Sequence, residues 1–265
     1  MNIDSKAVID SRAEIGRDVQ VGAGAVVGSD VKIGDRCVVG PNAVIMPYTT
    51  LGEDCRVHAG AVIGDTPQDL SFKHLVSHVR IGARCTFREG VTIHRGTKEG
   101  TETVVGDDCY LMANSHLAHN VILGNRVILA NGALLGGYVE IGDGAFISGN
   151  AVIHQFCRVG RLVMVGGLSG ISKDVPPFCM TRSGAVNTIV GFNIVGLRRN
   201  GFSPEQRNLV KTCYDIIYRQ GRNVSQAIEK LQAEPESPVI HEIVSFIQKS
   251  KRGICKFSSR GEEEE

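Results

Sequence analysis

Residues 114–120 contain two histidines, His116 and His119, three positions apart. A histidine side chain can take up or give a proton near neutral pH because its ordinary pKa is about 6.5. No serine or cysteine lies in a nucleophile-elbow motif, so the sequence does not indicate covalent catalysis. The residues favour direct transfer, in which a histidine activates a hydroxyl against an activated acyl group and Gly136 or Gly137 offers a backbone N–H to the oxyanion.

A repeat of six residues determines where these histidines lie. From Ile3 to Ile171, every sixth residue is aliphatic or Phe at 27 of 29 positions, and the exceptions are Asp69 and Glu99. Neither a helix nor an amphipathic strand has this period, but a short strand followed by a tight turn does. Three such units make one coil of 18 residues, so the sequence predicts a hexapeptide-repeat parallel β-helix. The periodicity alone does not give the handedness.

The repeat also indicates the domain organisation. We expect a parallel β-helix over residues 1–177, with loops inserted at 66–80 and 94–104 where the period is interrupted. Two prolines within 175–178 are expected to end the strand ladder. We then expect a small helical domain over 178–256 and a disordered acidic tail over 257–265.

Three helices are predicted in the C-terminal domain. The first starts with Ser203 as N-cap, has a proline at its first position and a capping box closed by Gln206, and ends at Gly221. A shorter helix is expected over 225–233, and a third starts at 237–238 and ends by residue 253.

Composition and charge narrow the class of protein. The chain has 265 residues and formal charge +1, and no stretch approaches the roughly 20 apolar residues of a membrane span. The N-terminus has no apolar signal core, so a cytoplasmic protein is expected. Residues 178–260 carry a net charge of +7 against −2 for 1–177, which favours an acidic partner, although a solvated helical face would look the same. We expect no nucleic-acid partner.

Five of the eight cysteines lie two positions before a repeat residue, where side chains are small and point inward. No CxxC pair is present, so we expect packing rather than metal or redox chemistry. The five are Cys37, Cys55, Cys85, Cys109 and Cys157.

Spacing in coils of 18 brings the polar candidates together. His154 follows His119 by 35 residues and Tyr138 follows it by 19, so all three are expected near one edge of the prism on successive coils. Neither these residues nor His116 occupy an inward position, so a core role does not explain them. An alternative is a zinc site built from His94, His116 and His119 across a trimer interface, as in hexapeptide proteins resembling γ-class carbonic anhydrases, although the last two ligands are three rather than five apart.

Several motifs carry a resemblance to a known family, the UDP-N-acetylglucosamine O-acyltransferases that begin lipid A synthesis. The match covers nearly the whole chain, including the helical C-terminal domain. We do not expect the extra N-terminal domain of the related N-acyltransferases. The motifs are TIHRGT (92–97), HLAH (116–119), GNRVILAN (124–131), HQFC (154–157), VMVGG (163–167) and GLRRNGF (196–202).

The resemblance implies a left-handed β-helix, a homotrimer with active sites between subunits, and no cofactor or bound metal. It implies transfer of a 3-hydroxyacyl group from acyl carrier protein to the 3-position of UDP-N-acetylglucosamine. The acidic carrier protein would be the partner of the basic C-terminal domain.

The resemblance also implies roles for single residues. His119 would be the general base and the Gly137 N–H the oxyanion donor. Gly167 lies where the family measures acyl length, and a glycine there leaves room for a longer chain. Asn193 and Arg199 would hold the nucleotide diphosphate. The remaining residues implied to bind substrate are Gln68, Asp69, His116, Asn120, Tyr138, His154, Gln155 and Arg198.

The chain departs from the family pattern at positions around the substrate. Asn120 replaces an Asp, Ser71 a Lys, Tyr138 a His, Val195 a Glu and Asn200 an Arg. Three alternatives therefore stay open. The acceptor is a different nucleotide sugar such as the 3-amino analogue, the protein is a zinc hydro-lyase, or it is a non-catalytic trimeric scaffold.

Overall fold

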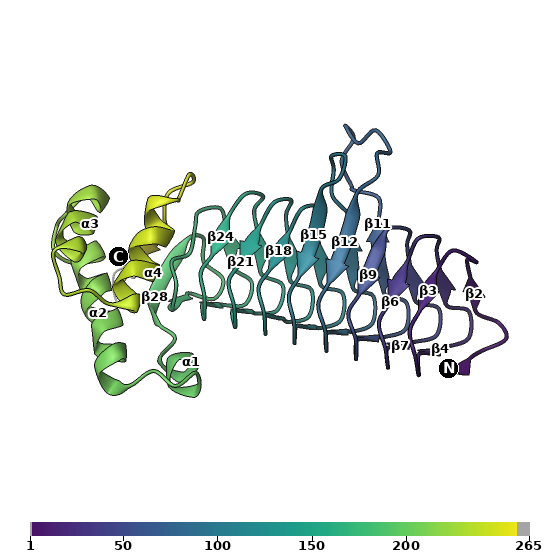
Figure 1. The fold of residues 1–265 in the computed structure, drawn as a ribbon. Coiled ribbons are helices and arrows are strands. Elements are labelled where there is room, and N and C mark those ends of the chain that lie inside the picture. The colour runs from purple at the N-terminus through teal and green to yellow at the C-terminus, as the bar shows by residue number, and fades with distance from the viewer. Residues whose placement is uncertain (1, 259–265) are drawn as a thin grey trace.

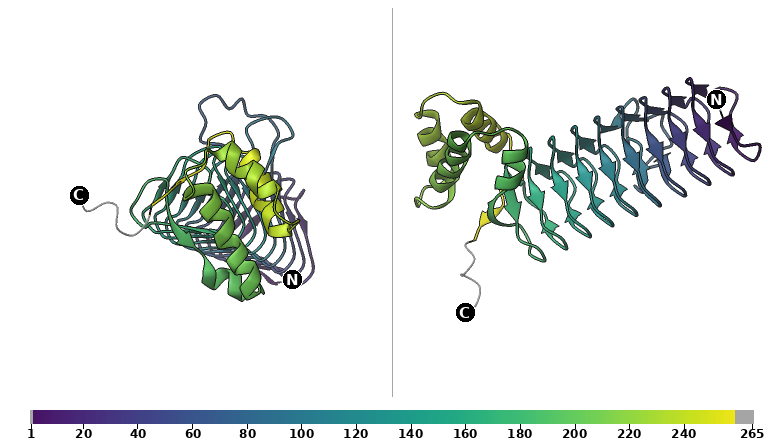
Figure 2. Two further views of the ribbon diagram at one scale, coloured as in Figure 1. Left: turned by 90° about the vertical axis from the view of Figure 1, so that its left-hand side faces the viewer. Right: turned by 90° about the horizontal axis from the view of Figure 1, so that it is seen from below.

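The computed structural model describes residues 2–258. Short strands joined by tight turns stack into a long prism, and a group of helices covers its C-terminal end (Figure 1). Seen along its axis, the prism has a three-sided outline (Figure 2, left). A loop stands out from the side of the prism near its middle (Figure 1).

Within residues 2–258 the strands form three sheets, one on each face of the prism. Sheet A contains, in spatial order, β1 (Asn2–Ile3), β4 (Gln20–Val21), β7 (Val38–Val39), β10 (Arg56–Val57), β13 (Thr86–Phe87), β16 (Tyr110–Leu111), β19 (Ile128–Leu129), β22 (Phe146–Ile147), β25 (Met164–Val165), β27 (Cys179–Thr181), β28 (Thr188–Phe192) and β29 (Lys256–Phe257). Sheet B contains β2 (Val8–Ile9), β5 (Val26–Val27), β8 (Val44–Ile45), β11 (Val62–Asp65), β14 (Thr92–His94), β17 (His116–Leu117), β20 (Leu134–Leu135), β23 (Val152–Ile153) and β26 (Gly170–Ile171). Sheet C contains β3 (Glu14–Ile15), β6 (Lys32–Ile33), β9 (Thr49–Leu51), β12 (His78–Ile81), β15 (Glu102–Val105), β18 (Ile122–Leu123), β21 (Glu140–Ile141) and β24 (Arg158–Val159).

The register confirms the predicted coil of 18 residues. Val8 pairs in parallel with Val26, and Leu134 pairs with Val152. Paired residues are further apart in the sequence where loops leave the prism. Val62 pairs with Thr92 across one loop, and Thr92 pairs with His116 across the other.

The core of the prism is a stack of inward-facing aliphatic side chains. Ile45, Ile63, Leu111 and Leu129 are fully buried, and so are the small residues two positions before them. All eight cysteines are free and buried, as the repeat predicted for five of them. Burial raises the pKa of Cys157 to about 11, so this thiol is unreactive at neutral pH.

The sheet continues past the two prolines that were expected to end it. Pro176 and Pro177 lie at a corner, where no ladder hydrogen bond is required, and β27 resumes pairing with β25 at Met180. β28 then pairs antiparallel with β27, so strands extend to residue 192.

The loops are shorter than predicted, because β12 and β15 begin earlier than the repeat alone indicates. The described loops cover 66–77 and 95–101. At the C-terminus, Phe257 lies in β29 and pairs with β28, so the expected tail does not begin at 257. The rest of that predicted tail, residues 259–265, lies outside the described residues.

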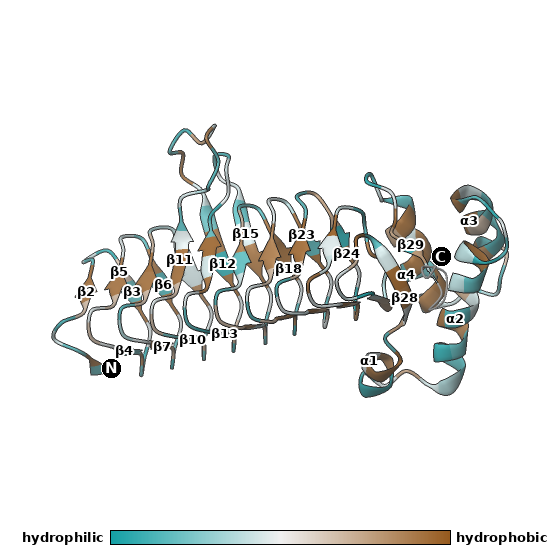
Figure 3. Cartoon of the chain, turned by 180° about the vertical axis from the view of Figure 1, so that it is seen from behind, coloured by the Kyte–Doolittle hydropathy of each residue, from teal (hydrophilic) through white to brown (hydrophobic). Residues whose placement is uncertain are grey.

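Four helices follow the strands: α1 (Ile194–Arg199), α2 (Pro204–Tyr218), α3 (Val224–Gln232) and α4 (Pro238–Gln248). The predicted capping box is present, since the Ser203 side chain accepts from the Gln206 N–H and the Gln206 side chain accepts from the Ser203 N–H. α4 is the most apolar of the long helices (Figure 3), and the Tyr214 hydroxyl of α2 donates to the Pro177 carbonyl. No helix within residues 2–258 is long and apolar enough to span a membrane.

Candidate active site

Sheet B carries a groove of about 390 Å³ on its outer surface. His116, Leu134 and Val152 are neighbours on β17, β20 and β23, and their side chains form the floor. The groove is lined by Gln68, His116, Ala118, His119, Leu134, Leu135, Gly136, Gly137, Val152, Ile153, His154 and Gln155. Six of the residues predicted from the sequence therefore meet in one place.

His119 and Gly137 lie at the corner between sheets B and C, one coil apart. A Cβ atom on Gly137 would lie 2.4 Å from Cε1 and 2.6 Å from Nε2 of His119, so the imidazole packs directly against the glycine backbone. Only a residue without a side chain leaves room for the ring at this position. Gly137 N–H makes no main-chain hydrogen bond within residues 2–258.

Three residues with positive φ form the adjoining column of the corner. Asn120, Tyr138 and Phe156 have φ of 59°, 60° and 65°. This conformation costs little for Asn but about 1–2 kcal/mol for residues with bulky side chains. The Tyr138 and Phe156 rings stack with centroids 5.0 Å apart, and Tyr138 meets the His119 ring edge-on at 5.3 Å. The prediction that His119, Tyr138 and His154 share one edge is confirmed.

The Asn120 carboxamide connects His119 to the loop at 95–101. Its Oδ1 lies 3.1 Å from His119 Nδ1 and accepts hydrogen bonds from the Thr97 N–H at 3.1 Å and the Thr97 hydroxyl at 3.0 Å. The Tyr138 hydroxyl lies 2.9 Å from Thr97 Oγ1. Asn120 is 7 % exposed, so these contacts lie in a largely water-free environment.

His116 is held beside a second, buried histidine. Its Nδ1 lies 2.8 Å from the Thr92 hydroxyl, and its ring meets that of His94 edge-on at 5.1 Å. Burial, reinforced by His94, lowers the pKa of His116 to about 4. His116 is therefore neutral over the physiological pH range.

The loop at 66–77 brings Gln68 to the groove and Asp69 into the electrostatic range of His119. The backbone N–H and the hydroxyl of Ser71 both donate to Asp69 Oδ1 at 2.8 Å, and they lower the pKa of that carboxyl, to which nearby His119 also contributes. Asp69 is therefore an ionised acceptor at neutral pH. Ser71, which replaces the lysine of the family pattern, thus has a defined role in orienting Asp69.

Arg95 anchors this loop to the prism. The Arg95 side chain is 8 % exposed, and its guanidinium lies 5.6 Å from the Tyr48 ring centroid and 5.7 Å from that of Phe72. Because Phe72 belongs to the loop and Tyr48 to the prism, the cation connects the two by cation–π contacts.

His154 and Gln155 form the exposed rim of the groove. His154 Nδ1 lies 3.1 Å from the Gln155 carbonyl oxygen, so the imidazole donates through Nδ1 and keeps Nε2 available to a ligand. Both side chains are exposed in the subunit.

Four predicted site residues lie away from the groove. Gly167 is at the opposite edge of sheet B, where a Cβ would find its nearest atom 3.4 Å away. Asn193 is the N-cap of α1, and its carboxamide accepts from Gly196 N–H and donates to the Leu162 carbonyl. Arg198 and Arg199 are exposed at the end of α1. A single subunit therefore does not bring these four to His119.

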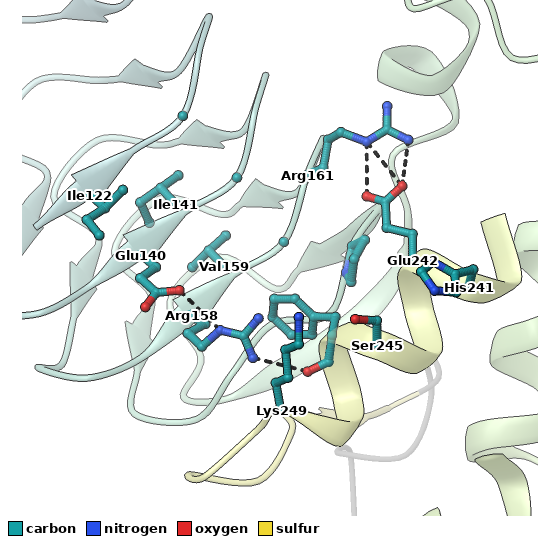
Figure 4. A pocket seen from close by; sticks show the side chains of 15 residues that line it. Ile122, Glu140, Ile141, Arg158, Val159, Arg161, His241, Glu242, Ser245 and Lys249 are labelled. Carbon is teal, nitrogen blue, oxygen red and sulfur yellow. Dashed lines mark hydrogen bonds and ion pairs between the residues drawn. The ribbon is translucent and has the colours of Figure 1, made fainter. Parts of the chain in front are cut away.

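Two larger grooves lie along sheet C. One, of about 470 Å³, follows the seam between sheet C and α4, and Figure 4 shows Arg161 paired with Glu242 and Arg158 with Glu140. Arg161 Nη2 lies 2.7 Å from Glu242 Oε2, and Arg158 donates to the Phe246 carbonyl at 3.1 Å. These contacts fasten α4 to the prism, so the seam is a structural contact.

The other groove, of about 740 Å³, adjoins the corner that carries Asn120, Tyr138 and Phe156. Its far side holds Lys249, Lys251 and Arg252. Asn120 and Tyr138, predicted to bind substrate, thus face a basic groove on the other side of the corner from His119.

The zinc alternative has no matching ligand set within one subunit. Among residues 2–258, no group of three or more His, Cys, Asp or Glu side chains is arranged to hold a metal ion.

Sequence reasoning did not single out Thr97, Thr92 or Phe156. Thr92 and Thr97 begin and end the motif TIHRGT, and their hydroxyls orient His116 and Asn120. The motif was a signal, but the contact of Thr97 with Asn120 depends on the path of the loop at 95–101, which the repeat does not specify.

Comparison with known proteins places this geometry in a class. A sequence model described as bacterial transferase hexapeptide (six repeats) matches residues 12–47, 30–65 and 102–137, and one described as UDP N-acetylglucosamine O-acyltransferase, domain 2, matches 174–255. A left-handed parallel β-helix with histidines in a corner groove and this helical domain defines a hexapeptide-repeat acyltransferase.

Individual relatives narrow the class to one family. Two relatives are named acyl-(acyl-carrier-protein)–UDP-N-acetylglucosamine O-acyltransferase. The one from Thermodesulfovibrio yellowstonii is 42 % identical over 96 % of this chain and 99 % of its own. The one from Campylobacter concisus is 39 % identical over 96 % of this chain and 97 % of its own. The crystal structure of a UDP-N-acetylglucosamine acyltransferase from Bacteroides fragilis has a TM-score of 0.91 at 42 % identity, covering 95 % of this chain and 98 % of its own. The chain belongs to the UDP-N-acetylglucosamine O-acyltransferase family.

Proposed function

We propose that this protein transfers an acyl group from acyl carrier protein to a hydroxyl of UDP-N-acetylglucosamine, the first step of lipid A synthesis. The observation that carries the proposal is His119, packed on Gly137 in a groove that also holds Gln68, His154 and Gln155. Relatives at about 40 % identity carry this activity in their names.

The proposed mechanism is a direct transfer. His119 takes the proton of the sugar hydroxyl while the hydroxyl oxygen attacks the thioester carbon. The negative charge that forms on the carbonyl oxygen lies against the Gly137 N–H, which no main-chain acceptor occupies in residues 2–258. Collapse of the intermediate breaks the carbon–sulfur bond, and the departing thiolate takes the proton back from His119.

Neutral and ionised neighbours support these roles. His116 stays neutral because burial lowers its pKa to about 4, so it adds no positive charge beside the base. Asp69 is ionised, since Ser71 lowers its pKa by donating two hydrogen bonds, and it can accept a hydrogen bond from a sugar hydroxyl.

We infer that the active unit is a homotrimer in which each site is completed by a neighbouring subunit. Gly167, Arg198 and Arg199 lie far along the same subunit from His119, whereas the same residues of a neighbour could close the groove. The outward row of sheet B is apolar, with Val8 62 % and Val152 47 % exposed, as expected of a surface that a partner covers.

The acyl carrier protein is the proposed partner of the basic C-terminal region. Residues 178–260 carry a net charge of +7, and Lys249, Lys251, Arg198 and Arg199 are exposed. We propose that Arg198 and Arg199, with Asn193, hold the nucleotide diphosphate of the acceptor. Gly167 leaves room for a long acyl chain, and the reaction is proposed to occur in the cytoplasm.

The test is acyl transfer from 3-hydroxyacyl carrier proteins of several chain lengths to UDP-N-acetylglucosamine and, separately, to its 3-amino analogue. We expect transfer to the first acceptor, and the loss of about 10²–10⁴-fold in kcat in His119→Ala. Transfer to neither acceptor with any chain length would overturn the proposal.

A further inference from the structure

The hydrogen bonds around Asn120 determine which atom of His119 carries a proton. The backbone N–H of Thr97 can only donate, so the Asn120 atom that it meets at 3.1 Å is the carboxamide oxygen. His119 Nδ1 lies 3.1 Å from the same oxygen, and an oxygen without hydrogen cannot donate to it. The Nδ1 atom must therefore carry the hydrogen, which leaves the lone pair of neutral His119 on Nε2.

The Tyr138 hydroxyl completes this chain of donors. The single hydroxyl hydrogen of Thr97 is used in the bond to Asn120 Oδ1, so Tyr138, 2.9 Å from Thr97 Oγ1, has to be the donor of that pair. The direction of every bond is then fixed from Tyr138 to Thr97 to Asn120, with His119 donating to the same oxygen. The Asn120 backbone is held as well, since its N–H donates to the buried hydroxyl of Thr103 at 2.8 Å.

We propose that Thr97 and Tyr138 are positioning residues that act through Asn120 to hold His119 in the Nδ1–H form with an uncharged partner. The Nε2 atom lies against Gly137 in the groove, where the proton of an acceptor hydroxyl would be taken. The kinetic part of this inference rests on the proposed acyl transfer, but the protonation state of the ring does not.

An uncharged partner has a consequence for pH dependence. A carboxylate in contact with an imidazole favours the protonated ring and so raises the pKa of the histidine. A close opposite charge shifts a pKa by about 1–3 units. Asn120 orients the ring and carries no charge. The other titratable groups around His119 are Asp69, Tyr138, His94, His116 and His154. Asp69 is an ionised carboxylate, and burial lowers the pKa of His94 and His116, so neither of these two adds a positive charge at neutral pH.

The first test is the pH profile of kcat/KM for Asn120→Asp and Asn120→Leu. Asn120→Asp keeps the acceptor and adds charge, so the acidic limb is expected to move to higher pH by about one unit or more. Asn120→Leu removes the acceptor, so kcat is expected to fall on the order of 10²-fold with little change in KM. An unmoved acidic limb together with full activity of Asn120→Leu would overturn the inference.

Thr97 offers a matched pair of variants. Thr97→Val keeps the shape and the N–H but removes the hydroxyl, and we expect kcat to fall about tenfold, as for one lost hydrogen bond. Thr97→Ser keeps the hydroxyl and should retain activity within about twofold. Equal loss in both variants would show that Thr97 only packs the loop.

The decisive readout is independent of activity. Nitrogen-15 NMR of histidine-labelled protein, with His119→Asn to assign the signal, reports which ring nitrogen carries the hydrogen. We expect the Nδ1–H form in the wild type and in Thr97→Ser, and a mixture of both forms in Asn120→Leu. A wild type in the Nε2–H form would refute the inference even if acyl transfer occurs. The Nδ1–H form in a protein without acyl transfer would refute only the proposed function.

Discussion

At the scale of single residues, the contact between Gly137 and His119 restricts the groove most tightly. Gly137→Ala would place a Cβ 2.4 Å from the imidazole, so the ring has to move away. We expect kcat to fall about 10²-fold, the cost of displacing a catalytic group by about 1 Å, while the melting temperature changes little.

A control for this substitution lies in β28. At Gly191, a Cβ would find its nearest atom, Met180 Cε, 4.0 Å away. Gly191→Ala should therefore leave both kcat and melting temperature unchanged. If Gly137→Ala were as active as Gly191→Ala, the packing of the ring on the backbone would have no catalytic importance.

The pair of His94 and His116 predicts how stability depends on pH. Burial lowers the pKa of His116 in the folded protein to about 4, whereas a histidine in the unfolded chain has a pKa of about 6.5. Between these two pH values the unfolded chain binds more protons than the folded protein. Stability should therefore fall as pH drops from about 6.5 to about 4.

Urea unfolding of wild type and His116→Gln at pH 7 and pH 4.5 checks this sign. The variant should lose less stability over this interval, because glutamine can still accept from the Thr92 hydroxyl but has no charge to bury. The stability of His116→Gln should still depend on pH to some extent, since burial also lowers the pKa of His94. An equal loss in the two proteins would contradict the argument.

At the scale of elements, Arg95 determines whether the loop at 66–77 stays on the prism. Arg95→Gln removes the cation from between Tyr48 and Phe72. We expect the loop to detach more often, so that trypsin cleaves after the exposed Lys73 several-fold faster, since each cation–π contact is worth about 0.5–2 kcal/mol. KM should rise more than kcat falls, because Asp69 travels with the loop.

Arg84→Gln is a suitable control for the loop experiment. The ion pairs of Arg84 join it to Asp107 and Asp108 on the surface of the prism. Cleavage after Lys73 at the wild-type rate in Arg84→Gln, but faster in Arg95→Gln, would assign the effect to the anchor. The same rate in all three proteins would show that the loop is held by other contacts.

The elements also show how far sequence reasoning extends. A period of six is a strong signal because every coil repeats the same inward position, so the prism and the shared edge of His119, Tyr138 and His154 were predictable. Pro177 was misleading, because a proline at a corner breaks no ladder hydrogen bond. The six-residue α1 was missed, since one and a half turns carry too little periodicity to be recognised.

Part of the site could not be predicted from the sequence, for a different reason. The pairing of Thr97 with Asn120 joins a loop to a corner 23 residues away, and an insertion breaks the repeat that would have aligned them. The roles proposed for Gly167, Arg198 and Arg199 require a neighbouring subunit, which no single chain contains.

At the scale of the whole molecule, the sheet B and sheet C faces of the prism differ in what they offer to a partner. The outward row of sheet C pairs its own charges, with Lys32 Nζ 2.9 Å from Glu14 Oε1 and Arg80 Nη2 2.8 Å from Glu102 Oε1. These charged side chains already have partners in the separate subunit and need no contact with another one. The outward row of sheet B begins with valines instead, and Val8 and Val26 remain 62 % and 37 % exposed.

This contrast predicts which face holds the proposed trimer together. Val26→Glu combined with Val44→Glu places charges on sheet B, outside the groove, and should convert the trimer to monomers because a buried unpaired carboxylate costs several kcal/mol. Thr50→Glu adds a charge to sheet C between Lys32 and Arg80 and should leave the trimer intact. Light scattering coupled to size-exclusion chromatography measures the mass of each. A monomeric wild type, or a trimer that dissociates only in Thr50→Glu, would show that sheet B is not the contact. Acyl transfer should be lost together with the trimer, because a separated subunit keeps His119 but lacks the neighbour that carries Arg198 and Arg199.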